Sequence, residues 1–248
     1  MDVVFGSSPL AAAVARRLAR DGATTLAGPT ELLGPWLWRR CDPGSAEGVN
    51  HALKGVDRVV VVLDDAASAA GLFTVLRPGT ASRGVAVLPP GGWRPDGLDR
   101  FTHWGSLRVG ATWGEDELLV AAWARRVAAG RALWVPDLGE VRVTAAVDAA
   151  NAVAALLHEP GGVWSVVGDE AARLSELAAQ IGLALDKPVR QRRATVGLAA
   201  WSAGVSVGAI RRLAVAADPH RHTPGWTPVA VVGRAGWFAP PERPRGRG

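Results

Sequence analysis

Residues 1–22 read MDVVFGSSPLAAAVARRLARDG, and this stretch decides the fold. A short apolar run, residues 3–5, stops at Gly6, and an alanine-rich segment with apolar side chains at a helical period follows it. Gly22 then stands where a helix C-cap is expected. A strand, a tight turn and a helix in this order are typical of the unit that opens a parallel, nucleotide-binding α/β sheet.

The turn, GSSPLA at residues 6–11, matches the G-x-G-x-x-G/A phosphate-binding pattern at its first and third positions. Gly6 suits the tight turn, and Ala11 lets the helix pack closely on the strand. Ser8 instead puts a Cβ where a glycine would let the backbone approach a pyrophosphate, and Pro9 removes one N–H from the helix N-terminus. We therefore predict weak binding of NAD or NADP by this turn, through Gly6, Ser8, Pro9, Leu10 and Ala11.

Further apolar runs along the chain alternate with helical patterns, at residues 23–27, 35–39, 59–63 and 84–88. This alternation predicts an α/β fold, a Rossmann-like doubly wound parallel sheet with a small C-terminal α/β annex. The strand order should reverse beside the first strand. The binding cleft is then expected at the carboxyl ends of the strands, near Gly6, Asp42 and Leu63.

Length and composition set the expected parts and the compartment. The 248 residues are 48% hydrophobic, enough for a large core. We expect a Rossmann-like nucleotide-binding core at 1–157, a smaller part completing the fold at 158–238, and a basic tail of disordered composition at 239–248. The single cysteine, Cys41, excludes an internal disulfide and indicates a reducing compartment. Because no signal-like start and no apolar stretch of about 20 residues is visible, we expect a cytoplasmic protein without membrane insertion.

Charge is distributed unevenly along the chain. From Lys187 onward there are 11 basic and two acidic residues, whereas residues 1–186 hold 17 basic and 21 acidic ones. This asymmetry suggests an anionic partner, such as a nucleic acid, for the basic C-terminal part. The alternative is a solvated basic face followed by a frayed tail.

Two segments carry a resemblance to a known family. Residues 42–63, DPGSAEGVNHALKGVDRVVVVL, resemble the D-x-x-D-x-x-x-L-x-x-A-L-x-G-V-D-x-V-V-x-L segment of the extended short-chain dehydrogenase/reductases, the NAD-dependent epimerase/dehydratase group. Residues 106–114, SLRVGATWG, resemble the family's L-R-P-G-x-x-Y-G, with Trp113 in place of the tyrosine. The resemblance covers roughly residues 1–190 and implies that Asp42 lies beside the adenine ring. An acid at that point also stabilises the following helix by itself.

The family's reaction uses a tyrosine held near its deprotonation point by a lysine, on a long helix after the fifth strand. The sequence contains no tyrosine, and residues 89–105, which follow the strand at 84–88, contain no lysine and several prolines and glycines. Lys54 and Lys187 are the only lysines of the chain. We therefore expect no tyrosine-dependent redox or epimerase activity.

Three hypotheses for the function remain open. The first is a non-catalytic dinucleotide or small-molecule binder, acting as a sensor or subunit. The second is an oxidoreductase or epimerase-like enzyme with non-standard acid–base residues, for which the candidates are Asp96, Asp99, His103, Glu115, Asp116 and Glu117. The third is a polyanion or nucleic-acid binder that works through the basic C-terminal part. The sequence leaves the oligomeric state and the substrate unspecified.

Some polar and aromatic residues could have a functional role, but a structural role also explains them. Asp148 is interpreted as a helix N-cap rather than a catalytic acid. His220 and His222 lack further ligands nearby, so no metal site is predicted. The tryptophans near the expected substrate position, Trp93, Trp104 and Trp113, either line that site or belong to the core.

Overall fold

The computed structural model describes residues 1–62, 66–88, 96–101, 103–114, 117–159, 161–166 and 171–214. Its centre is a seven-stranded sheet in the order β10-β6-β5-β4-β1-β2-β3, in which all neighbouring strands are parallel. The strands are β1 (Asp2–Phe5), β2 (Thr24–Gly28), β3 (Leu37–Arg40), β4 (Arg58–Val62), β5 (Arg83–Leu88), β6 (Trp104–Val109) and β10 (Gly162–Val166). The order reverses beside β1, which confirms the prediction of a doubly wound sheet.

Successive side chains of each strand point to opposite faces of this sheet, and both faces are buried. Helices therefore cover both faces. Val4 of β1 packs in a core with α1 (Pro9–Leu18) and α5 (Ala146–Leu156). Val3 and Phe5, which point to the other face, pack in a core with α2 (Ala46–Ala52) and α3 (Ala66–Val75). A short 3-10 helix, η1 (Leu98–Arg100), adds Leu98 to that second core.

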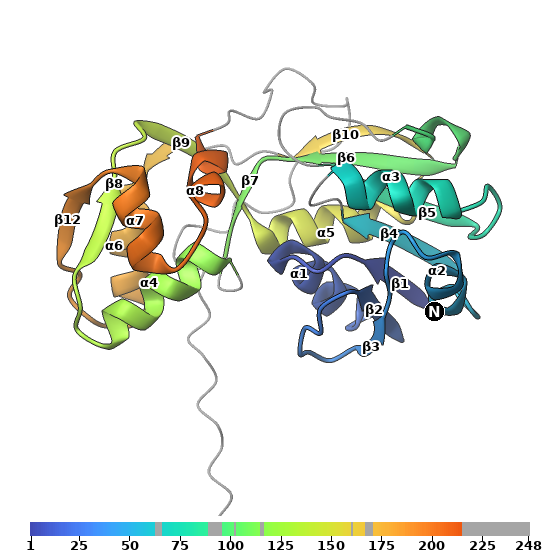
Figure 1. Ribbon diagram of the computed structural model, residues 1–248, viewed down its shortest axis with the longest axis horizontal. Coiled ribbons are helices and arrows are strands. Elements are labelled where there is room, and N and C mark those ends of the chain that lie inside the picture. The colour runs from blue at the N-terminus through green and yellow to red at the C-terminus, as the bar shows by residue number, and fades with distance from the viewer. Residues whose placement is uncertain are drawn as a thin grey trace, which may run out of the picture.

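A second, smaller unit lies beside the main sheet, and β7 leads into it from β6 (Figure 1). It contains a three-stranded sheet, β11-β9-β7, and a two-stranded one, β12-β8. Its elements are β7 (Ala111–Trp113), α4 (Leu118–Ala128), β8 (Leu133–Pro136), β9 (Glu140–Ala145), β11 (Ala171–Arg173), α6 (Leu174–Ala184), β12 (Gln191–Ala194), α7 (Val196–Ala203) and α8 (Val207–Leu213). This unit corresponds to the expected α/β annex.

The chain passes back and forth between the two units. Buried residues between 111 and 143 belong to the core of the second unit, those between 146 and 166 return to the main sheet, and those from 172 to 213 belong to the second unit again. A single boundary at residue 157, as expected from the sequence, therefore does not separate the two cores. Residues 215–248, with the expected tail at 239–248, lie outside the described residues.

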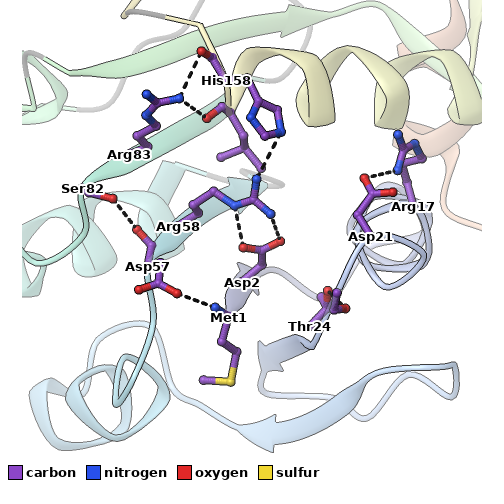
Figure 2. A network of polar contacts seen from close by, with 12 residues as sticks. Met1, Asp2, Arg17, Asp21, Thr24, Asp57, Arg58, Ser82, Arg83 and His158 are labelled. Atoms are coloured by element: carbon purple, nitrogen blue, oxygen red, sulfur yellow. Dashed lines mark hydrogen bonds and ion pairs between the residues drawn. The ribbon is translucent and has the colours of Figure 1, made fainter.

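The amino ends of the central strands are joined by a network of charged side chains (Figure 2). Asp2, which starts β1, accepts two hydrogen bonds of 2.7 Å from Arg58 at the start of β4. Arg58 also contacts His158 Nε2 at 3.2 Å, just beyond the C-terminus of α5. Arg83, at the start of β5, donates to the carbonyl oxygens of Leu157 and His158 at 3.4 and 3.1 Å. The network fastens the end of α5 to three neighbouring strands.

Two groups of this network have shifted pKa values. Asp57 is exposed and accepts a 2.5 Å hydrogen bond from the amino group of Met1, and this bond and the positive charge lower the pKa of Asp57. The hydrogen bonds to Asp2 raise the pKa of Arg58. Both shifts favour the charged forms, so the amino edge of the sheet is an ionic network at neutral pH.

Within the part of the chain that the structure describes, no helix is long and apolar enough to cross a membrane. Those residues also contain no cluster of three or more histidine, cysteine or carboxylate side chains that a metal ion would require. His220 and His222 fall outside them.

Candidate functional site

A cavity of about 390 Å³ lies at the carboxyl edge of the main sheet, where the second unit meets it. Residues 7–10 of the first turn line one side, and the last residues of β4, β5 and β6 line the sheet side. Trp113 and Glu117 line it from the second unit. This is the edge at which open parallel sheets bind their ligands, next to the reversal of strand order.

Close packing behind the first turn requires glycine at two positions. Gly6 has a φ of +153°, and a Cβ built on it would lie 2.8 Å from the Cβ of Ala11. A Cβ on Gly28, the last residue of β2, would lie 2.7 Å from the carbonyl oxygen of Gly6. The helix start and two strand ends are therefore in contact, which is the packing expected from Gly6 and Ala11.

Ser8 is the N-cap of α1, a role that the sequence analysis missed. Its hydroxyl oxygen accepts a 3.3 Å hydrogen bond from the Ala11 N–H, and Pro9 occupies the first helical position. Within the described structure, the N–H groups of Ser7, Ser8 and Leu10 have no hydrogen-bond partner and remain available to a ligand. Ser8, Pro9 and Leu10 line the cavity, but capping and proline together reduce its anion-binding donors.

Asp42 lies outside the lining of this cavity. It lies exposed between β3 and α2, where its Oδ1 accepts a 3.0 Å hydrogen bond from the Gly44 N–H. Ser45, rather than Asp42, caps α2. Leu63 lies outside the described residues, although its neighbour Val62 lines the cavity.

Cys41 precedes Asp42 and is buried at the end of β3. Burial, with a smaller contribution from the Asp42 charge, raises the pKa of its thiol from 9.0 to about 11. The thiol therefore stays protonated at neutral pH and has no nucleophilic role there.

The second unit gives the cavity a buried indole and a carboxylate. Trp113 is 1% exposed and packs edge-to-face on Trp123, with 6.2 Å between the ring centroids. Its Nε1–H has no hydrogen-bond partner among the described residues. The Thr112 hydroxyl donates a hydrogen bond to Glu117 Oε1 and thereby orients that carboxylate. Trp113 and Glu117 both line the cavity, and Thr112 holds the Glu117 carboxylate there.

The other candidate tryptophans and acid–base residues fall into three groups: core residues, exposed residues and residues outside the described part of the chain. Trp104 belongs to the core, where it stacks with Phe73 and Phe101, so the structural interpretation holds for it. His103 and Asp96 are exposed, and neither lines the cavity. Trp93, Glu115, Asp116 and the side chain of Asp99 lie outside the described residues. Asp148 lies in the first turn of α5, whose N-cap is Ala145, so the N-cap interpretation of Asp148 was wrong.

Strand pairing places one further residue near the candidate site. Arg40, at the end of β3, is in register with Gly28 at the end of β2. In a dinucleotide fold the end of the second strand, here Gly28, carries either an acid for the ribose hydroxyl or an arginine for a 2′-phosphate, and Arg40 lies beside it on the neighbouring strand. Arg40 is exposed, and its side chain makes no hydrogen bond within the described residues. The 12-residue separation in sequence hid this proximity, which only the register of β2 and β3 reveals.

A second cavity, of about 210 Å³, lies within the smaller unit between β8, β12 and the start of α6. Arg173, Arg192 and Arg193 line it together with Asp137. Arg193 pairs with Asp137 at 3.0 Å, and Arg192 lies over the Trp134 ring, 5.5 Å from its centroid. Three guanidinium groups against one carboxylate give this surface a positive character.

No protein-family model and no curated protein sequence matches the chain. Solved structures match its fold at 11–16% identity. A UDP-glucose 4-epimerase from Thermus thermophilus in complex with NAD is 16% identical, with a TM-score of 0.60 over 89% of this chain and 94% of that chain. A UDP-N-acetylglucosamine 4-epimerase from Bacillus cereus is also 16% identical, with a TM-score of 0.61 over 79% and 85%.

A UDP-N-acetylglucosamine 4-epimerase from Methanobrevibacter ruminantium, in complex with UDP-N-acetylmuramic acid, is 13% identical, with a TM-score of 0.59 over 78% of this chain and 84% of that chain. Likeness at such identities shows the fold alone. The chain therefore has the Rossmann-like α/β fold of the UDP-sugar 4-epimerases.

Proposed function

We propose that the protein binds a dinucleotide at the carboxyl edge of its main sheet, as a sensor or subunit, without the tyrosine-dependent reaction of the enzymes that share its fold. The observation that carries the proposal is the cavity between residues 7–10 and the strand ends. The neighbour from Thermus thermophilus was solved with NAD, which supports the same ligand class here.

The residues around the turn fit a dinucleotide only in part. Gly6, Gly28 and Ala11 provide the close backbone packing that such a turn requires. Ser8 keeps the Ala11 N–H in an intramolecular hydrogen bond, and its Cβ stands at the phosphate approach. The proposed site therefore binds weakly. A bound NAD or NADP would supply hydride-transfer chemistry, but no tyrosine in the sequence can exchange the accompanying proton.

Two variants of Ser8 test the proposal, with NADH and NADPH fluorescence as the readout. Ser8→Ala and Ser8→Gly both remove the hydroxyl cap and release the Ala11 N–H, but only Ser8→Gly also removes the Cβ. We expect Ser8→Gly to bind about tenfold more tightly than Ser8→Ala, because the phosphate gains a charge-assisted hydrogen bond that the Cβ obstructs. Equal affinities would show that the Cβ is no obstacle. Absence of any dinucleotide binding in the wild type and both variants would overturn the proposal.

The choice between NAD and NADP depends on Arg40 in this proposal. Its exposed guanidinium beside Gly28 favours a 2′-phosphate. Arg40→Ala should weaken NADPH binding by about tenfold and leave NADH binding unchanged. Arg20→Ala, which removes an exposed arginine of the segment that follows α1, is the matched control. Equal losses for both cofactors would refute the assignment.

An enzymatic alternative rests on Glu117, which among the candidates that the structure describes is the one that lines the cavity. Its hydrogen bond with Thr112 fixes one carboxylate oxygen, as a general base requires. Turnover of ketones or nucleotide sugars with NADH or NADPH, abolished in Glu117→Gln and retained in the exposed-site variant His103→Gln, would establish this alternative. We expect no turnover.

An anionic partner is a second candidate function, favoured by the arginines at the smaller cavity. Arg192 and Arg173 lack carboxylate partners within the described residues, whereas Arg193 has Asp137. Binding of single-stranded DNA that falls steeply with salt, and is reduced in Arg192→Ala but not in Arg77→Ala, would support a polyanion partner. Binding that does not respond to Arg192→Ala would count against this surface.

A further inference from the structure

Arg108 differs from the other half-buried arginines in the part of the chain that the structure describes. It lies near the end of β6 and is half-buried, with a buried Nε that has no hydrogen-bond partner among the described residues. No ion pair of its guanidinium group is found among those residues either. The other half-buried arginines of the described chain all have partners: Arg16, Arg17, Arg39, Arg58 and Arg126. Arg108 is thus a permanent positive charge, partly withdrawn from water, with no counter-charge among the described residues.

Arg108 is not itself among the residues that line the 390 Å³ cavity, but its neighbours are. Its register partner on β5 is Leu88, and the residues that follow it are Val109 and Gly110. All three line the 390 Å³ cavity. Trp104 precedes Arg108 on the same side of β6, and its side chain is packed in the core.

We propose that Arg108 binds an oxyanion, the carboxylate or phosphate group of a second ligand that lies beside the dinucleotide at the ends of β5 and β6. This inference rests on the proposed function for the identity of its neighbour. A partly desolvated cation is unfavourable without a counter-charge, and a bound oxyanion supplies one. The planar guanidinium presents paired N–H donors that match both oxygens of a carboxylate or phosphate.

The test compares Arg108→Met, Arg108→Lys and the exposed-site control Arg77→Met in the full chain. Thermal midpoints are measured at constant ionic strength with acetate, lactate and inorganic phosphate as probes, with and without NADPH. We expect at least one oxyanion to raise the midpoint of the wild type and of Arg77→Met. In Arg108→Met the affinity for that oxyanion should fall by about 10- to 100-fold. In Arg108→Lys it should fall by less, because lysine keeps the positive charge but lacks the paired N–H donors of the guanidinium. Carboxylates and phosphate are separate arms and identify which group is bound.

A purely structural role for Arg108 predicts a different outcome. Without any probe, Arg108→Met should not lower the midpoint, because no partner group is left unpaired. A lower midpoint together with an unchanged oxyanion response would overturn the inference. A loss of NADPH affinity in Arg108→Met, measured without added oxyanion, would also overturn it by showing that the bound phosphate belongs to the dinucleotide. If the wild type binds an oxyanion through Arg108 but no dinucleotide, the proposed function fails and the oxyanion site stands.

Discussion

The two edges of the main sheet use their polar groups in opposite ways. At the amino edge, Asp2, Arg58, Arg83 and His158 contact one another or backbone carbonyls (Figure 2). At the carboxyl edge, Arg108 Nε and Trp113 Nε1 are buried without partners in the described structure, and a cavity adjoins them. Buried polar groups are normally paired, and a few others in the described chain, such as those of Thr25 and Gln180, also lack partners. It is therefore the cavity beside Arg108 and Trp113 that marks this edge as the one open to a ligand. Stability and binding are therefore assigned to opposite ends of the same strands.

The largest expected effect tests the amino edge. Asp2→Ala should lower the free energy of unfolding by about 2–4 kcal/mol, because it leaves the half-buried Arg58 without its carboxylate. The control Asp21→Ala removes an exposed partner of Arg17 and should change it by less than about 0.5 kcal/mol. Urea unfolding measures both. If the two variants lose the same stability, the amino edge is not the stabilising one.

The next effect tests how tightly the backbone is packed at the carboxyl edge. Gly6→Ala should lower the free energy of unfolding by about 1–3 kcal/mol, since the new Cβ would lie 2.8 Å from that of Ala11. Gly22→Ala is the control, because a Cβ there meets no atom within 4 Å. A Gly6 variant as stable as the Gly22 variant would show that the turn relaxes freely.

A smaller effect concerns the cap of α1 at the carboxyl edge. Ser8→Ala should lower the free energy of unfolding by about 1 kcal/mol, and Ser8→Gly by only a few tenths. Thermal unfolding of the two proteins gives the difference. A larger loss in Ser8→Gly than in Ser8→Ala would mean that the serine Cβ itself stabilises the turn.

The smallest effect at neutral pH is that of two titratable groups, Asp57 at the amino edge and Cys41 at the carboxyl edge. They are separated by the pH dependence of the free energy of unfolding. The pKa of Asp57 is lowered in the folded protein, so its contribution at the amino edge is present above its unfolded pKa and is lost as the pH falls through the folded value. The pKa of Cys41 is raised, so its contribution is complete below pH 9.0 and is lost as the pH rises through about 11. Asp57→Asn should flatten only the acid limb of the stability profile, and Cys41→Ala only the alkaline limb. Any effect of either variant on the opposite limb would contradict this division.

Much of the fold could be predicted because its signals are local. Residues 3–22 contain a strand, a glycine turn and a helix in a contiguous run, and the apolar runs that follow have the length of buried parallel strands. The capping role of Ser8 escaped prediction because the same residue also fits a position of the phosphate-binding pattern. Without coordinates, nothing distinguishes a hydroxyl that caps the helix from a Cβ that obstructs a ligand.

The remaining features depend on contacts between residues far apart in sequence. Arg40 lies beside Gly28 only through the register of β2 and β3. The lack of partners around Arg108 depends on which side chains from β5, β10 and the helices reach it, and no sequence pattern records that. The interleaving of the two cores along the chain also depends on such contacts, because α5 and β10 pack on the main sheet after the chain has already entered the second unit.

That interleaving has a consequence for synthesis on the ribosome. The residues that complete the main sheet, α5 and β10, emerge only after residues 111–145, which belong to the other core. Until β10 arrives, the backbone of β6 is an open edge capable of pairing with another nascent chain. The two units must therefore mature together, and a truncation between them would release an aggregation-prone intermediate rather than a smaller protein.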